Sequence, residues 1–160
     1  MNDQYASILT KFPLLDGFTV AGAQMLLECG EIKDYAPGDL VFGEGEPGTS
    51  AMLVLTGKLQ VFVKRSGNDL VLKDAEPGTM LGELAVLCNI PRSASVRAIE
   101  KSTVVQWSAE NFHRLLLRSN LFSERVLGQS LRTLIQKERS LVDSLVEARE
   151  GSGPNNQEKT

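Results

Sequence analysis

Our predictions for the fold and the function of this chain start from residues 82–98, GELAVLCNIPRSASVRA. Gly82 allows backbone to approach a ligand where a Cβ would collide. Glu83–Cys88 favours a short helical turn, whose first N–H groups have no partner within the turn and therefore attract an anion. Pro91 precedes Arg92, whose planar guanidinium suits two oxygens of one phosphate. The stretch therefore predicts a site for a small anion.

A carboxylate in the same stretch points to the other end of the ligand. Glu83 would repel a phosphate at short range, because like charges repel each other. It can instead accept a hydrogen bond from a sugar hydroxyl. Ser93 adds a hydroxyl beside Arg92, and the small side chains of Ser93 and Ala94 leave the approach open. We therefore expect a ligand with one negative charge and a neighbouring hydroxyl.

This order of residues resembles the phosphate-binding cassette of cyclic nucleotide-binding domains, such as the catabolite-activator proteins and the regulatory subunits of cAMP-dependent kinase. The matching segments are Gly82-Glu83-Leu84-Ala85, Pro91-Arg92-Ser93-Ala94-Ser95-Val96 and Ala98. The resemblance implies that Glu83, next to Gly82, holds the ribose 2′-hydroxyl and that Arg92 holds the cyclic phosphate. It further implies that Ser93 and the N–H groups near Gly82, Leu84, Ala85 and Ala94 complete the cradle. Leu81 stands where many members have Phe, which is an apolar exchange facing the core.

The region 31–107 consists of short apolar runs separated by turn residues such as Pro37-Gly38, Pro47-Gly48 and Pro77-Gly78. Within 58–64, Leu59, Val61 and Val63 share one face of a half-buried strand. Strands are expected at 40–42, 52–55, 58–64, 70–73, 95–99 and 103–107. Many short strands with Gly and Pro at the corners predict an antiparallel β-roll or jelly-roll barrel, so the fold class is mainly β with flanking helices. The fold that the resemblance implies is the same.

The base of the nucleotide is expected to lie against apolar residues of this roll. Val61, Leu72 and Val86 are the candidates by position, and each is equally consistent with an ordinary core residue.

Helical periodicity flanks the roll on both sides. Residues 1–30 are expected to be helical, with Thr19 as a possible N-cap, and a short helix at 110–117 is expected to open from Ser108. A longer helix at about 122–150 carries an apolar stripe at heptad spacing, which is interrupted only by Glu138. The stripe comprises Leu127, Leu131, Leu134, Leu141, Leu145 and Ala148. It favours a parallel homodimer, and the alternative is a helix folded back on its own barrel.

In the resembling family this long helix also covers the pocket and touches the base. The covering position falls around 137–139, so Glu138 or Arg139 is a candidate for contact with the base. A solvated ion-pair face formed by Lys137, Glu138 and Arg139 is the alternative.

Composition excludes several classes of protein. The 160 residues, 42% of them hydrophobic and 23% charged, fit one globular domain plus something smaller. A net charge of −3 gives no basic field, so neither nucleic acid nor membrane is expected as a partner of this chain alone. No segment has the length of a membrane span, and the N-terminus lacks the features of a signal peptide, so we expect a cytoplasmic protein.

Catalytic and metal chemistry find few suitable residues. The only histidine, His113, lies on a predicted helix and is expected at the surface. A metal site of the cupin kind or a Ser/His/Asp set therefore cannot be built, and neither an enzyme nor a metal is expected. Cys29 and Cys88 lie far apart in the sequence, so we expect two buried thiols in a reducing compartment.

The sequence thus predicts a regulatory module that binds a cyclic purine nucleotide, cAMP before cGMP, without any other cofactor, and that shifts its C-terminal helix on binding. The expected parts are a helical segment at 1–30, the nucleotide-binding roll at 31–108, C-terminal helices at 109–150 and a disordered tail at 151–160. The alternative function is a dimerising interaction protein that has lost the nucleotide. The chain is either a stand-alone sensor or a piece of a longer regulator.

Overall fold

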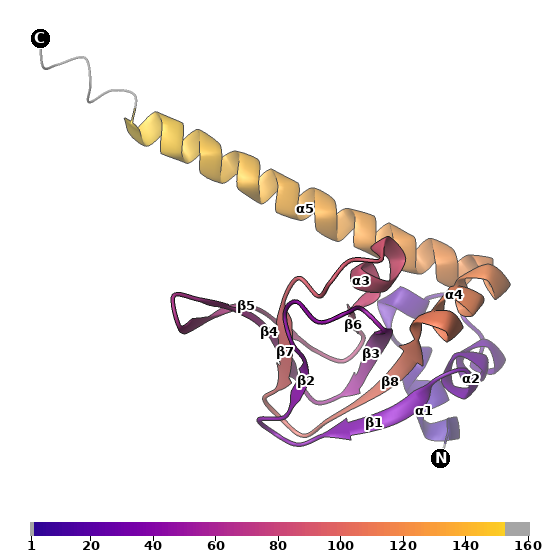
Figure 1. Cartoon of the computed structure of the whole chain (residues 1–160). Helices are drawn as coiled ribbons and strands as arrows, with labels where there is room; N and C mark the ends of the chain where they lie inside the picture. The colour runs from indigo at the N-terminus through magenta and orange to yellow at the C-terminus, as the bar shows by residue number, and fades with distance from the viewer. Residues whose placement is uncertain (1, 153–160) are drawn as a thin grey trace, which may run out of the picture. The chain divides into compact units, whose positions relative to one another are not determined.

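The computed structural model describes the backbone of residues 2–152 and the side chains of residues 3–151 (Figure 1). It divides within α5 into two units, residues 1–125 and 126–160, which are described separately. The N-terminal elements are α1 (Asn2–Leu9), the 3-10 turn η1 (Pro13–Leu15) and α2 (Val20–Glu28). The strands are β1 (Glu31–Tyr35), β2 (Leu40–Phe42), β3 (Ser50–Thr56), β4 (Leu59–Arg65), β5 (Asn68–Ala75), β6 (Met80–Leu81), β7 (Ser95–Ala98) and β8 (Ser102–Ser108). The remaining helices are α3 (Glu83–Cys88), α4 (Ala109–Arg118) and α5 (Asn120–Ser152).

The strands form two four-stranded sheets, ordered β1-β8-β3-β6 and β2-β7-β4-β5. Within each sheet, the neighbouring strands pair in antiparallel fashion. The two sheets do not join into one closed barrel, and they enclose an apolar interior as a roll. The prediction of a mainly β, antiparallel β-roll with flanking helices is confirmed.

The interior of the roll follows from the alternation of side chains along its strands. Leu59, Val61 and Val63 of β4 belong to one buried cluster with residues of β3 and β7, as their period-two spacing predicted. Six of the seven residues of β3 are buried instead of every second one. A strand that is covered on both faces needs a continuous apolar run, which here is AMLVL within SAMLVLT.

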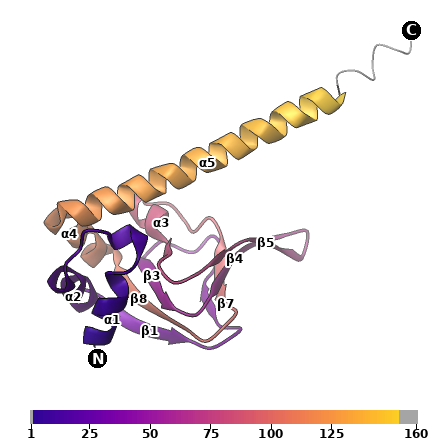
Figure 2. The same ribbon diagram turned by 180° about the vertical axis from the view of Figure 1, so that it is seen from behind.

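Helices α1, α2 and α4 lie beside the sheet that contains β1, β8 and β3 (Figure 2). Trp107 of β8 is fully buried there, and its indole N–H donates to the carbonyl of Leu26 at 2.8 Å. Its ring packs against Phe112 and Phe122 at centroid distances of 6.2 and 5.9 Å. Thr19 caps α2 and Ser108 caps α4, each by accepting from a backbone N–H, as predicted.

The prediction of two buried thiols is wrong. Cys29 is only partly buried, and Cys88 is exposed. Cys88 follows the buried Val86 by two residues on α3, and two residues turn a helix by about 200°, which places the thiol on the opposite side. No helix within residues 2–152 is both long enough and apolar enough to cross a lipid bilayer.

Candidate functional site

The helix α3 interrupts the strands between β6 and β7, and left-handed backbone begins and ends it. Gly82 precedes α3 at φ 78° and ψ 0°, and no side chain caps the helix there. Asn89 follows α3 at φ 51° and ψ 51°, and its N–H donates to the carbonyl of Ala85. The first N–H groups of a helix have no partner within the helix itself, and such a helix start favours an anion nearby.

Arg92 lies in the interior next to this turn, with 5% of its surface exposed. Its Nη1 donates to the carbonyl of Gly82 at 3.0 Å. Its Nη2 donates to the carbonyl of Ser50 at 2.8 Å and to the Ser50 hydroxyl at 3.1 Å. The Phe42 ring covers one face of the guanidinium, with its centroid 4.1 Å from Cζ. All three hydrogen-bond acceptors are uncharged oxygens, so a buried cation is held by neutral groups.

The electrostatics of Arg92 favour an anionic ligand. Burial lowers the pKa of the Arg92 guanidinium, while the nearby carboxylates of Glu46 and Glu83 act to raise it. The Nε atom of Arg92 is buried and has no hydrogen-bond partner. A desolvated cation with an unused donor costs free energy, and a bound phosphate would offset that cost.

The loop that precedes β3 holds the backbone of Arg92 from the other side. The N–H of Arg92 donates to the carbonyl of Glu46, and the N–H of Gly45 donates to the carbonyl of Arg92, both at 2.8 Å. Pro47 and Pro91 form an isolated antiparallel bridge. Gly48 lies so close to Ala85 that any Cβ at this position would overlap it. These contacts bring the loop, α3 and Arg92 into one cluster.

The other residues expected to hold phosphate and ribose lie along the same segment. Glu83 and Leu84 are partly buried on the first turn of α3. Ala85 and Ala94 are buried, and Ser93 is exposed. The structure thus brings Gly82 into direct contact with Arg92 and places Glu83 immediately after that contact.

The candidates for contact with the base lie in different surroundings. Val61 in β4 and Val86 in α3 are buried, with 7% and 5% of their surface exposed. Leu72 lies in the β4–β5 hairpin and is 53% exposed. Glu138 and Arg139 are exposed on α5, in the unit that begins at Val126, and border a shallow depression together with Ile135, Val142 and Asp143.

Three residues near Arg92 were not foreseen from the sequence. Ser50 and Phe42 contact its guanidinium, and Glu46 is the carboxylate with the largest influence on its pKa. Ser50 lies 42 residues from Arg92 along the chain, a separation over which local sequence patterns carry no signal. The segment GEGEPGTS, ending at Ser50, has turn residues that predict a loop but not its contacts.

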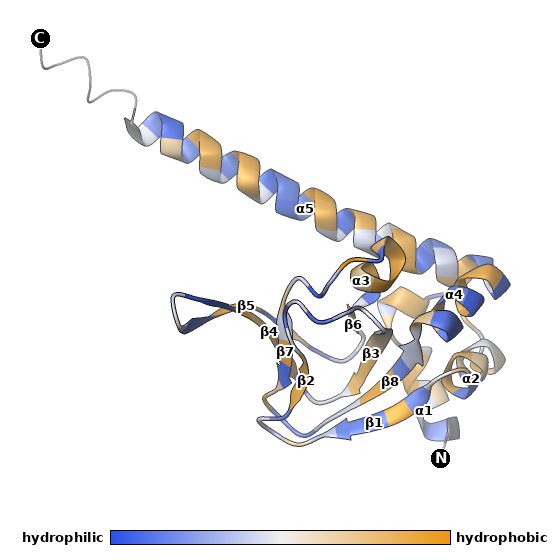
Figure 3. Ribbon diagram, in the orientation of Figure 1, coloured by the Kyte–Doolittle hydropathy of each residue, from blue (hydrophilic) through white to orange (hydrophobic). Residues whose placement is uncertain are grey.

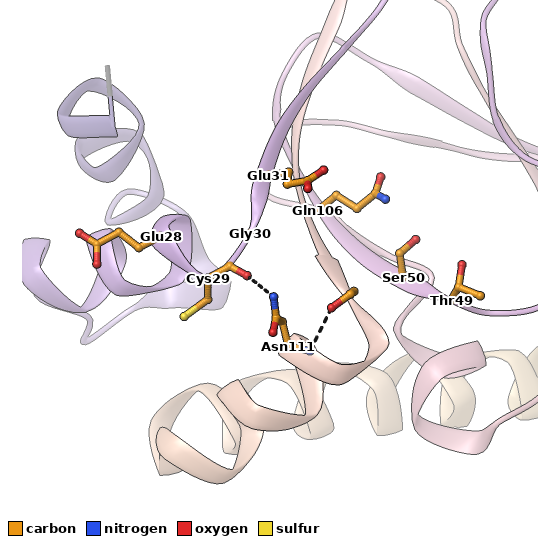
Figure 4. A pocket seen from close by; sticks show the side chains of 9 residues that line it. Glu28, Cys29, Gly30, Glu31, Thr49, Ser50, Gln106 and Asn111 are labelled. Carbon is orange, nitrogen blue, oxygen red and sulfur yellow. Dashed lines mark hydrogen bonds between the residues drawn. The ribbon is translucent and has the colours of Figure 1, made fainter.

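A separate cavity of about 410 Å³ opens between α2, β1, β3, β8 and α4 (Figure 4). Its lining is largely polar and comprises Glu28, Cys29, Gly30, Glu31, Thr49, Ser50, Gln106, Ser108 and Asn111. The Asn111 amide closes one side by donating to the carbonyl of Cys29 at 3.1 Å. No group of three or more His, Cys, Asp or Glu side chains within residues 3–151 is arranged to hold a metal ion.

Comparison with known proteins identifies the family to which this fold belongs. The model of the cyclic nucleotide-binding domain matches residues 32–119. The cAMP-dependent protein kinase regulatory subunit of Hypocrea atroviridis is 34% identical over 112 residues, which cover 70% of this chain and 23% of that protein. The chain spans between 23% and 29% of the length of the first three such relatives.

Solved structures show the same fold. The catabolite activator protein of Thermus thermophilus superposes with a TM-score of 0.77 at 27% identity, covering 84% of this chain and 63% of that one. A cAMP-bound PfPKA-R fragment superposes with a TM-score of 0.71 at 26% identity, covering 88% and 47%. By name, the relative from Hypocrea atroviridis is a regulatory subunit and the Thermus protein is an activator. The family model matches more than half of the length of this chain, and the residues of the cassette are present in the sequence. The chain therefore belongs to the cyclic nucleotide-binding domain family.

Proposed function

We propose that the chain is a sensor module that binds a cyclic purine nucleotide, cAMP before cGMP, without catalysing a reaction. The observation that supports this most is the burial of Arg92 against neutral oxygens with its Nε unused. A buried guanidinium of this kind is destabilising by itself and becomes favourable when it meets a phosphate. The names of the relatives support cAMP, since they are cAMP-dependent regulatory subunits and a cAMP-bound fragment.

Each part of the nucleotide has a proposed partner. Arg92 takes the cyclic phosphate together with Ser93, Ala94 and the N–H groups of Leu84 and Ala85. Glu83, beside the open backbone at Gly82, accepts from the ribose 2′-hydroxyl. Val61, Leu72 and Val86 form the proposed apolar contact with the base, and Glu138 or Arg139 is the proposed contact from α5. We further propose that the roll binds the nucleotide and that the C-terminal helix shifts when the nucleotide is bound.

Isothermal titration calorimetry of the purified chain with cAMP, cGMP and 5′-AMP tests this function. We expect saturable binding of cAMP, weaker binding of cGMP and much weaker binding of 5′-AMP. The phosphate of 5′-AMP is not held by a ring, so binding it costs additional conformational entropy. If neither cyclic nucleotide binds at millimolar concentration, the sensor proposal is wrong and the alternative, an interaction protein that has lost its nucleotide, takes its place.

The long helix α5 supports a second element of the proposal, a homodimer. Orange apolar residues recur along α5 between polar ones (Figure 3). Five leucines at heptad spacing are exposed in the chain alone: Leu127, Leu131, Leu134, Leu141 and Leu145, at 44%, 58%, 46%, 66% and 66%. Such a stripe is typical of a helix that pairs with another helix in a coiled coil. A regulatory partner such as a kinase subunit is proposed from the relatives' names alone.

Charge placed on this stripe should separate the dimer. For the double substitution Leu134→Glu and Leu141→Glu, we expect a monomer by size-exclusion chromatography with light scattering, because buried carboxylates without partners oppose pairing. Val146→Glu is the matched control, since Val146 is also exposed on α5, at 47%, but is not one of the residues of the leucine stripe. A dimer that survives the double substitution, or a wild-type chain that is already monomeric, contradicts the homodimer.

We also propose that nucleotide binding changes the environment of α5 through a shift between two populated states of the protein. The free energy available for that shift is the difference in nucleotide affinity between the two states. The proposed setting is the cytoplasm. Backbone chemical shifts of residues 127–145 that stay unchanged on saturation with cAMP would contradict the coupling.

A further inference from the structure

Ser50 stands at the start of β3, where two of its oxygens meet the buried guanidinium of Arg92. Its carbonyl and its Oγ accept from Nη2 at 2.8 and 3.1 Å. Ser50 is 8% exposed, so these bonds lie largely out of water, where a hydrogen bond to a charged donor is worth more. Figure 4 labels Ser50 beside Thr49, next to the cavity that both residues line.

The contacts of Arg92 fix the plane of its guanidinium and leave a defined part of it free. Phe42 covers one face, Gly82 accepts from Nη1, and Ser50 occupies Nη2 with two acceptors. Each Nη atom carries two hydrogens and Nε carries one. The second hydrogen of Nη1 and the hydrogen of Nε are therefore not used by the three bonds. Ser50 thus holds the guanidinium through Nη2, while the hydrogen of Nε and one hydrogen of Nη1 remain for a ligand.

We propose that Ser50 is a positioning residue for the nucleotide phosphate, whose hydroxyl orients Arg92 by holding Nη2. This inference rests on the proposed function, since it assigns a role in binding the same phosphate. Ser50 does not contact the ligand in this scheme. Its hydroxyl removes one rotational freedom of the guanidinium before the ligand arrives, and preorganisation of this kind raises affinity by lowering the entropy lost on binding.

The fold itself does not require the hydroxyl. The backbone of β3 is held by its antiparallel pairing with β8, which begins at Ser50 and Ser108, and by its pairing with β6. The carbonyl of Ser50 would still accept from Nη2 in an alanine variant. Removing Oγ therefore deletes one contact of Arg92 and leaves the strand pairing in place.

Titration of the full chain with cAMP, comparing Ser50→Ala with wild type, tests the proposal. We expect affinity about tenfold weaker, as for the loss of one hydrogen bond to a charged group, with little change in the unfolding temperature of the nucleotide-free chain. Thr49→Ala is the matched control, because it removes a neighbouring exposed hydroxyl that makes no hydrogen bond to Arg92, and its affinity should equal that of wild type. Ser50→Thr retains the hydroxyl and should restore affinity to within about twofold of wild type, which covers the case in which the alanine variant folds poorly.

A double-mutant cycle separates positioning from a general structural effect. In an Arg92→Lys background the compact ammonium cannot reproduce the fork, so adding Ser50→Ala should weaken the residual affinity by less than about twofold. Equal losses from Ser50→Ala in both backgrounds, or no loss in the wild-type background, overturn the proposal. A wild-type chain that binds no cyclic nucleotide overturns the proposed function instead, so the two failures are distinguishable.

Discussion

Replacing Arg92 with methionine is expected to weaken cAMP binding by about a hundredfold to a thousandfold, which corresponds to roughly 3–5 kcal/mol. The phosphate would lose its only proposed cationic partner while remaining desolvated, and methionine fills a similar apolar volume without supplying a donor. Arg92→Lys should fall between wild type and Arg92→Met, because an ammonium restores the charge but not the planar fork. Calorimetric titration of the three proteins measures the effect.

The stability of the nucleotide-free chain should respond far less to the same substitution. Arg92→Met removes three hydrogen bonds but also removes the cost of burying a cation, and these terms oppose each other. We therefore expect the thermal stabilisation by cAMP to disappear while the unfolding temperature without ligand changes little. A large loss of stability in the absence of nucleotide would show that Arg92 serves the fold and would contradict the ligand assignment.

Arg97 provides a control of the same chemistry outside the cassette. Its Cζ also lies 4.1 Å from the centroid of a phenylalanine ring, that of Phe62, and it donates to Gln60 and Asp69. Arg97→Met should cost some stability, because these three partners tie β7 to β4 and β5. Its affinity for cAMP should match that of wild type. A loss at Arg97 as large as the loss at Arg92 would mean that either substitution acts through the fold.

The sequence predicted those parts of the fold that have a local pattern. Six expected strands are found, because each combines an apolar run or alternation with bounding turn residues. β1 was not expected, since its sequence EIKDY has no apolar run and none of its residues is fully buried, and it lies at the edge of the sheet, paired with β8. β6 was not expected because two residues are too few to show a period. Both strands depend on pairing with distant segments, which local propensity does not encode.

The residues of the site were likewise predicted only where they follow one another in a local sequence pattern. The cassette from Gly82 to Arg92 is continuous in sequence, and its order of residue types was enough to predict an anion site. Ser50 in β3 and Phe42 in β2 contact Arg92 from strands that are distant in the sequence, so their roles became visible only in the folded chain. Leu72 shows the converse limit. Leu72 was a candidate for contact with the base by its position in a predicted strand, whereas in the β4–β5 hairpin residues 68–74 are all exposed.

Gly82→Ala is expected to impair both binding and stability, because Gly82 adopts a left-handed backbone conformation and also lies too close to Arg92 to leave room for a Cβ. Its φ of +78° is left-handed, which costs an alanine about 1–2 kcal/mol. An alanine Cβ would also lie 2.5 Å from Nη1 of Arg92 and 3.0 Å from the carbonyl of Ser50. Strand backbone cannot retreat easily, so the guanidinium must move and the fork loses its orientation. We expect cAMP affinity to fall about a hundredfold, which corresponds to the loss of two hydrogen bonds to a charged group at about tenfold each.

Gly67→Ala separates these two effects. Gly67 has nearly the same conformation, φ +79°, but a Cβ there would meet nothing within 4 Å. Gly67→Ala should therefore lower the unfolding temperature through backbone strain alone and leave cAMP affinity unchanged. If Gly82→Ala lowers stability by the same amount as Gly67→Ala and binds cAMP like wild type, the close approach between Gly82 and Arg92 has no part in holding the phosphate. A loss of cAMP affinity in Gly82→Ala but not in Gly67→Ala would show that the absence of a Cβ at Gly82 leaves room for the arginine that binds the ligand.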